Sequence, residues 1–135
     1  MTARPWPSLL LLGPTGSGKT PLGAEIERRG LGGRPCVHLD FGANLRAIAA
    51  DPRASGRLST AEVEAVRVSL ATGALFEDRD MPMIVKIVEA FAEDGRLGFG
   101  TLLVLNGLPR HAKQAEGLAG VVDVRIVVRL EASAA

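Results

Sequence analysis

The stretch Gly-Pro-Thr-Gly-Ser-Gly-Lys-Thr at residues 13–20 constrains the fold of this chain more than any other feature. An apolar run, Ser8–Leu12, comes directly before it and is typical of a buried strand. The segment after it, Lys19–Arg29, carries Leu22 and Ile26 on one side, as an amphipathic helix does. A glycine-rich loop between a buried strand and a helix indicates an α/β architecture.

The spacing Gly13-x-x-x-x-Gly18-Lys19-Thr20 satisfies the pattern of a phosphate-binding loop, in the strand-to-helix setting that the pattern requires. Glycines let the backbone approach phosphate oxygens closely and direct its N–H groups at them. The lysine supplies a mobile positive charge, and the threonine hydroxyl is a ligand for Mg²⁺. We therefore predict a nucleoside triphosphate site in which the Thr20 hydroxyl faces the Mg²⁺ ion, made by Gly13, Thr15, Gly16, Ser17, Gly18, Lys19 and Thr20.

Strands and helices alternate along the rest of the chain. We expect strands at 36–39, 101–105 and 121–130, helices at 42–50 and 110–118, and two further helices beginning after Ser59 and Asp80. This alternation predicts right-handed crossovers and a parallel sheet covered on both faces. The expected fold is one domain over residues 1–135, a P-loop three-layer α/β/α sandwich. Its core would lie at about 8–41 and 100–131, with a helical insertion at about 42–95.

The composition excludes several classes of protein. With 47% hydrophobic residues, the 135-residue chain can bury a core. A charged fraction of 23% and a net charge of +1 argue against disorder and against a strongly basic nucleic-acid binder. No apolar segment reaches the roughly 18 residues that a membrane helix needs. We therefore expect a cytoplasmic protein whose partners are nucleotides, not nucleic acid and not a membrane.

Three later segments make the chain resemble the adenylate kinase family of nucleoside monophosphate kinases. Residues 38–46 are similar to the family's second strand and helix, where a glycine precedes a Leu-Arg pair. Residues 73–78, followed by an amphipathic helix, resemble the segment that closes over the base of the monophosphate. Residues 106–110, Asn-Gly-Leu-Pro-Arg, with Gln114 after them, look like the family's Asp-Gly-Phe-Pro-Arg and Gln-Ala signature.

The resemblance implies an activity and a role for several residues. The implied activity is transfer of a phosphoryl group from ATP, with Mg²⁺, to a nucleoside monophosphate, AMP above all. Arg46 and Arg110 would hold the phosphate of this acceptor, and Gln114 would read the adenine edge. The implied acceptor-binding residues are Gly42, Arg46, Gly107, Arg110 and Gln114, and the implied catalytic residues are Lys19 and Arg110.

Four positions depart from the family's pattern. Pro21 has no N–H to offer a phosphate, and Phe41 and Ala43 stand where the family has a threonine and an aspartate beside the monophosphate. Asn106 replaces an aspartate that orients magnesium-bound water. The family's lid and last strand and helix are also expected to be absent from residues 1–135. Two alternatives therefore stay open: an ATP-binding module that is non-catalytic or incomplete, and a kinase for a small metabolite.

Other polar and aromatic residues have plainer interpretations. Asp40 ends the second expected strand, where it would either face the site or cap the next helix. His38 is expected to be a packed strand residue and Cys36 a small core residue; His38 and His111 lack the cysteine or carboxylate cluster of a metal site. Trp6 is expected to be a loosely packed residue near the N-terminus, with stacking on a base as the alternative.

Overall fold

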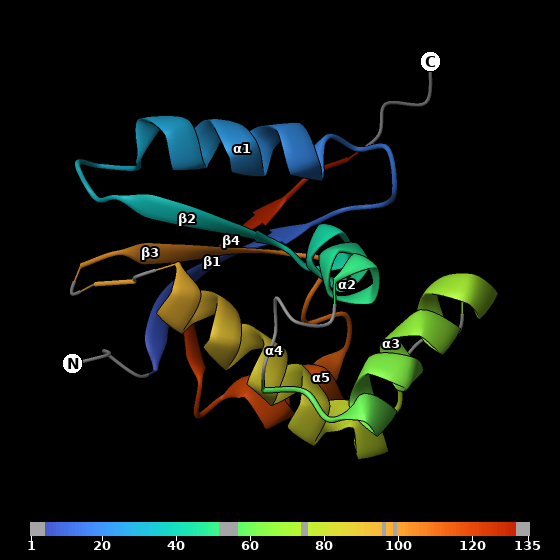
Figure 1. Ribbon diagram of the computed structural model, residues 1–135. Helices are drawn as coiled ribbons and strands as arrows, with labels where there is room; N and C mark the ends of the chain where they lie inside the picture. The colour runs from blue at the N-terminus through green and yellow to red at the C-terminus, as the bar shows by residue number, and fades with distance from the viewer. Residues whose placement is uncertain (1–4, 52–56, 74–75, 96, 99, 132–135) are drawn as a thin grey trace.

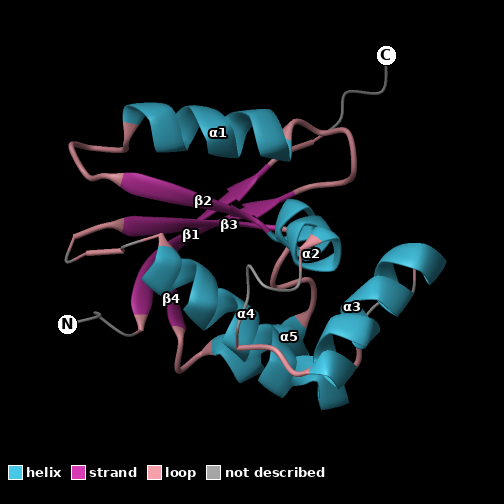
Figure 2. Cartoon of the chain, viewed as in Figure 1, coloured by secondary structure: helices cyan, strands magenta, loops and turns pink. Residues whose placement is uncertain are grey.

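Four parallel strands form one sheet in the order β2-β3-β1-β4 (Figure 1). The computed structural model describes residues 5–51, 57–73, 76–95, 97–98 and 100–131. The strands are β1 (Trp6–Leu12), β2 (Cys36–Asp40), β3 (Leu102–Asn106) and β4 (Val122–Arg129). Helices lie on both sides of the sheet (Figure 2). The predicted α/β fold with a parallel sheet is therefore confirmed.

Helix α1 (Lys19–Arg29) covers one face of the sheet and has the predicted bounds. Its partly buried Leu22 and Ile26 pack against a buried cluster from the strands. That cluster consists of Leu9, Leu11, Cys36, Leu102 and Val104. Cys36 is 5% exposed, so its interpretation as a small core residue is confirmed.

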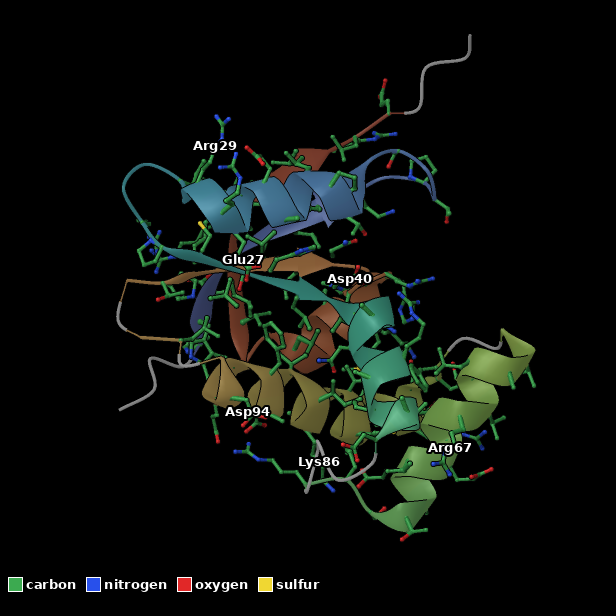
Figure 3. The ribbon with its side chains drawn as sticks, turned by 45° about the horizontal axis from the view of Figure 1, so that its top comes forward. Glu27, Arg29, Asp40, Arg67, Lys86 and Asp94 are labelled. Atoms are coloured by element: carbon green, nitrogen blue, oxygen red, sulfur yellow. The ribbon has the colours of Figure 1, made fainter. Side chains whose placement is uncertain are left out.

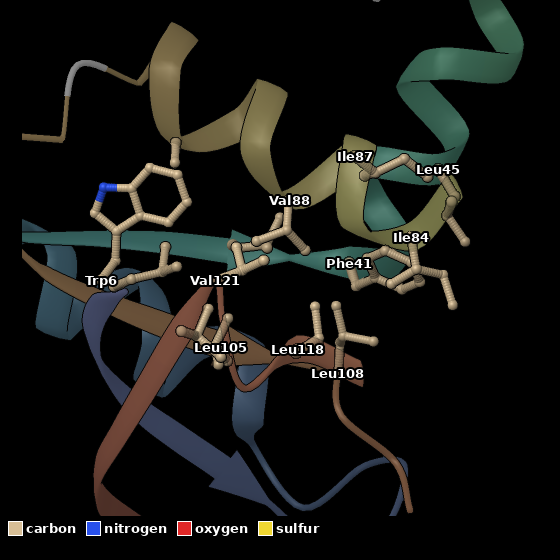
Figure 4. Close-up of a cluster of buried hydrophobic side chains, with 14 of the residues drawn as sticks. Trp6, Phe41, Leu45, Ile84, Ile87, Val88, Leu105, Leu108, Leu118 and Val121 are labelled. Atoms are coloured by element: carbon tan, nitrogen blue, oxygen red, sulfur yellow. The ribbon is translucent and has the colours of Figure 1, made fainter. Parts of the chain in front are cut away.

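Helices α4 (Met81–Asp94) and α5 (Ala112–Leu118) cover the opposite face, where the larger core lies (Figure 4). Ile84 and Val88 of α4 are completely buried in this core. Trp6 belongs to the same core and is 1% exposed, so the expectation of a loosely packed tryptophan is wrong. The physical reason is that β1 begins at Trp6, and the backbone N–H of Trp6 donates to the backbone carbonyl of Val121 at 2.8 Å.

Between β2 and β3 the chain forms α2 (Phe41–Ala50) and α3 (Thr60–Thr72), which contact each other. The start of α3 after Ser59 is as predicted. The Ser59 hydroxyl accepts from the N–H of Glu62 at 3.1 Å, and the Glu62 carboxylate accepts from the N–H of Ser59 at 2.9 Å. This reciprocal pair satisfies two N–H groups that the helix leaves unpaired.

The expected helix start after Asp80 is confirmed, whereas the expected start at Arg110 is wrong. Asp80 directly precedes α4, but its carboxylate accepts from the N–H of Glu77 at 2.7 Å and so caps a 3₁₀ turn, Asp78–Asp80, instead of the helix. Helix α5 begins at Ala112 and not at Arg110, because the backbone of His111 is extended, with φ −152° and ψ 170°. The N–H of Arg110 donates to the side chain of Gln114 at 2.8 Å. None of the helices in the described ranges has the length and apolar run of a bilayer crossing.

The burial of side chains in the core predicts how much a substitution lowers the free energy of unfolding. Leu105 lies on the central strand β3 and is completely buried, whereas Val127 on β4 is 56% exposed. Leu105→Ala is expected to lower the free energy of unfolding by about 2–5 kcal/mol through lost burial and an unfilled cavity. Val127→Ala, the matched control, is expected to change it by less than about 0.5 kcal/mol. Urea denaturation of both variants tests this, and equal effects would contradict the described core.

Candidate functional site

A cleft of about 790 Å³ opens at the carboxyl ends of β1, β2 and β3. Loops that follow parallel strands meet at this edge of a sheet, which is where open α/β folds bind ligands. The charged residues that line the cleft are Lys19, Asp40, Arg46 and Arg110. Three cations against one carboxylate favour an anionic ligand, and the volume lies in the range of small-molecule sites.

The floor of the cleft is the loop at residues 13–18, between β1 and α1. Gly13, Gly16 and Gly18 have φ of 154°, 84° and 97°, values that side-chain-bearing residues rarely adopt. A Cβ atom on Gly13 would lie 2.6 Å from the Ser17 hydroxyl oxygen, so the first glycine is also required by space. Around Gly16 and Gly18 no atom lies within 4 Å of such a Cβ, which leaves the backbone there open to a ligand.

The loop ends at the N-terminus of α1, which points its free N–H groups at the cleft. Gly18 precedes the helix in a left-handed conformation, without a side-chain cap. The first hydrogen bond of the helix runs from the N–H of Leu22 to the carbonyl of Gly18. In the described chain the N–H groups of Lys19 and Thr20 therefore have no partner, and Pro21 has no N–H to satisfy. Together with the helix dipole, these groups are suited to bind an anion.

Lys19 folds back over the loop that precedes it. Its Nζ atom donates to the carbonyl of Gly13 and, at 3.3 Å, to that of Pro14. Within the described residues it forms no ion pair with a carboxylate. Its positive charge is therefore held above the loop by neutral groups and is available to an anion.

A polar network joins α1 to the ends of β2 and β3. The Asn106 amide Nδ2 donates to Thr20 Oγ1 at 3.1 Å and lies 3.2 Å from His38 Nε2. Thr20 Oγ1 in turn donates to Asp40 Oδ2 at 3.2 Å. The strand register accounts for these contacts, because Asp40 and Asn106 are paired neighbours on the adjacent parallel strands β2 and β3.

Asp40 performs both of the roles that its sequence position leaves open. Its Oδ1 atom accepts from the N–H of Ala43 at 3.1 Å and so caps α2, while Oδ2 accepts from Thr20 in the cleft. Figure 3 shows Asp40 where β2 passes into α2. One carboxylate thus fixes the start of a helix and contributes a negative group to the site.

His38 is the inner member of the network. It is half-buried, and a Cβ atom on Gly23 of α1 would lie 2.3 Å from its Nε2 atom, so the helix can approach only because residue 23 is glycine. Burial lowers the pKa of His38 below its ordinary value of 6.5, against the opposing charges of Asp40 and Glu27. With the Asn106 amide nitrogen facing Nε2, a neutral ring that carries its proton on Nδ1 is the tautomer that completes this contact.

The predicted acceptor-binding residues lie around the same cleft. Gly42, Arg46, Gly107 and Arg110 line it, and Arg110 Nε donates to the carbonyl of Gly107 at 3.1 Å. Arg46 and Arg110 are both exposed and form no ion pair within the described ranges. Gln114 is 6% exposed, and its Oε1 atom accepts a hydrogen bond from the backbone N–H of Arg110. The side-chain carbonyl of Gln114 therefore positions the segment that contains Arg110.

A smaller apolar pocket of about 90 Å³ continues from the cleft past Gly42 and Arg110. Phe41 and Phe76 meet edge to face in its wall, with ring centroids 6.3 Å apart. The predicted base-covering segment, residues 73–78, contributes Phe76, whereas its residues 74–75 lie outside the described part of the chain. The pocket thus places an aromatic and apolar wall beside the cationic cleft.

The oxygen atoms of the cleft suit a hard cation that also has other ligands. Within the described ranges no three histidine, cysteine, aspartate or glutamate side chains gather as a metal site. Thr20 Oγ1 and Asp40 Oδ2 are nevertheless adjacent oxygen donors at the end of the phosphate-type loop. Mg²⁺ is commonly bound by one or two protein oxygens together with substrate phosphates and water, so this donor set fits it.

No family model matches the chain, and a search of curated proteins found no match either. The resemblance to adenylate kinases therefore remains a prediction based on the motifs. What the geometry adds independently is that residues of the loop at 13–20 and of the segments 38–46 and 106–110, which are far apart in the sequence, line one cleft, while Phe76 and Gln114 line the smaller pocket beside it.

Sequence reasoning missed the part of the site that faces α1. His38 was expected to be a packed strand residue, and its contact with Asn106 was not anticipated. The available signal was Gly23, a glycine inside an amphipathic helix, which indicates close approach to a neighbouring group. Identifying that neighbour required the strand register.

The network predicts a pH dependence of stability. Because burial lowers the pKa of folded His38, the unfolded chain binds its proton first as pH falls. The His38 contribution to stability is therefore complete above the ordinary pKa of 6.5 and is lost as pH drops toward the lower folded value. We expect the free energy of unfolding to fall more between about pH 8 and pH 5 in the wild type than in His38→Gln. Denaturant titrations at several pH values measure this difference, and parallel pH profiles would contradict it.

Proposed function

We propose that this cytoplasmic protein binds ATP with Mg²⁺ and transfers its terminal phosphoryl group to a nucleoside monophosphate, AMP above all. The observation that carries the proposal is the convergence of Lys19, Arg46 and Arg110 on one cleft, above a glycine loop and a helix N-terminus. Such a set of donors fits two phosphorylated ligands that meet end to end.

The triphosphate side of the proposal is supported by the loop at residues 13–18. Its open glycine backbone and the free N–H groups of Lys19 and Thr20 are suited to phosphate oxygens. The buried hydroxyl of Ser17 has no hydrogen-bond partner in the described chain, and an unsatisfied buried polar group is costly unless a ligand or a shift of the loop satisfies it. Bound beside Thr20 and Asp40, Mg²⁺ would supply neutralisation of the phosphate charge.

The acceptor side is supported by Arg46, Arg110 and the adjoining apolar pocket. The two guanidinium groups would hold the acceptor phosphate, and the pocket beside Phe41 and Phe76 would take its base. An oxygen of the acceptor phosphate forms the new bond to the γ-phosphorus, and the bond from that phosphorus to its bridging oxygen breaks. ATP and AMP thereby give two ADP. The acceptor oxygen is already nucleophilic, so catalysis would consist of positioning and charge stabilisation.

One observation favours a second candidate, an ATP-binding module without transferase activity. Asn106 points its amide nitrogen at Thr20 and His38, so it supplies a donor where the adenylate kinase pattern has a carboxylate. In this alternative the loop binds ATP as above, but no monophosphate is phosphorylated.

Lys19 gives the first test of the proposal. Lys19→Ala is expected to weaken ATP binding by about 10- to 100-fold, because a hydrogen bond to a charged group contributes about 1.5–3 kcal/mol. The control is Lys113→Ala, since Lys113 is an exposed lysine of α5 paired with Asp78 at 3.1 Å. Isothermal calorimetry measures both affinities. Undiminished ATP binding by Lys19→Ala would refute the proposed triphosphate site.

Arg110 tests the acceptor side. In a coupled assay with AMP, GMP, CMP and UMP, we expect AMP to be the best acceptor. Arg110→Ala is expected to raise the KM for AMP while leaving the affinity for ATP unchanged, whereas Arg125→Ala, on the exposed part of β4, changes neither. Intact ATP binding with negligible transfer by the wild type would favour the module without transferase activity. Transfer to a non-nucleotide acceptor alone would instead favour a small-metabolite kinase.

A further inference from the structure

The cleft contains a carboxylate on β2 where the adenylate kinase pattern places one on β3. Asp40 is the only carboxylate among the described residues that line it. We propose that Asp40, together with Thr20, positions the Mg²⁺ ion that accompanies the triphosphate. This inference rests on the proposed ATP site, but it does not require that the protein be a transferase.

The hydrogen bonds around Thr20 leave room for a cation. A threonine hydroxyl has one proton to donate and two lone pairs with which to accept. Its proton is directed to Asp40 Oδ2 at 3.2 Å, and one lone pair accepts from Asn106 Nδ2 at 3.1 Å. One lone pair of Oγ1 therefore remains, and it lies beside a negatively charged oxygen.

Asn106 is unsuited to the same task in its present orientation. Its Nδ2 group donates to Thr20 and lies 3.2 Å from His38 Nε2, so the nitrogen side of the amide faces these two residues. An N–H group repels a cation, whereas a carboxylate oxygen binds Mg²⁺ or its water molecules.

Asp40 also has the rigidity that a metal-positioning residue needs. Its second oxygen, Oδ1, is fixed by the N–H of Ala43 at 3.1 Å, and its backbone is held in β2 beside Asn106. The carboxylate therefore keeps Oδ2 toward the cleft without a salt bridge to Arg46 or Arg110 in the described chain. A negative oxygen held in this way, next to the phosphate loop, is available to a cation.

The test compares ATP binding with and without Mg²⁺ by calorimetry. In the wild type, Mg²⁺ is expected to tighten ATP binding. In Asp40→Asn, metal-free ATP is expected to bind at least as well as to the wild type, because a negative charge has been removed. The tightening by Mg²⁺ is expected to fall by roughly 10-fold or more, as for other groups that orient a metal's ligands. Asparagine caps a helix as well as aspartate does, so α2 is expected to persist.

Asp123→Asn is the matched control, because Asp123 is a carboxylate of β4 paired with Arg125 and lies outside the cleft. Asp40→Ser provides a second variant, which also keeps a helix cap but lacks a carboxylate. A readout independent of affinity is the electron paramagnetic resonance spectrum of Mn²⁺ in the ATP complex, which should change in both Asp40 variants and not in Asp123→Asn.

The possible results distinguish the role of Asp40 from the proposed ATP site itself. If Asp40→Asn and Asp40→Ser bind ATP and keep the full tightening by Mg²⁺, the role of Asp40 is refuted while the ATP site stands. If the wild type binds no ATP with or without Mg²⁺, the proposed function itself fails and the role of Asp40 fails with it. Loss of the tightening in both variants, with metal-free binding retained, supports the assignment.

Discussion

The close approach of α1 to the sheet at Gly23 is the contact on which the rest of the site depends. Any larger residue there would collide with His38, whose ring lies where a Cβ atom would extend. Thr20 is one helical turn earlier and on the same side of α1, so the spacing that admits His38 also brings the threonine hydroxyl to Asn106 and Asp40. A packing constraint in the helix thereby sets the position of a polar group in the cleft.

The cleft combines this fixed polar interior with a cationic rim. The network of Asp40, Asn106 and His38 lies on rigid strand ends, whereas Arg46 and Arg110 are exposed. Charge stabilisation works best when the dipoles are held in place before the ligand arrives. The strand ends and the N-terminus of α1 provide that arrangement, and the longer arginine side chains can adjust to the proposed acceptor.

The sequence patterns correctly predicted those features that depend on residues close together in the chain. The bounds of α1, the cap at Ser59 and the buried position of Cys36 follow from spacing and residue type, and all three are confirmed. The misplaced features have two different causes. Trp6 is buried because β1 extends to it and pairs with the distant Val121. Helix α5 starts late because the backbone of His111 is extended. The residues of the cleft could be predicted from their motifs, but the His38–Asn106 contact could not, since it depends on strand register and helix spacing.

The burial of Trp6 determines what intrinsic fluorescence can report about this protein. The chain has one tryptophan and no tyrosine, so its ultraviolet emission comes almost wholly from one indole. That indole lies at the first residue of β1, and the phosphate-type loop follows the last, a separation of about 20 Å along the strand. Emission at Trp6 therefore registers loss of the core sensitively, but it is remote from any ligand in the cleft. Unfolding can therefore be followed without a label, whereas the proposed binding of a nucleotide calls for calorimetry or a labelled nucleotide.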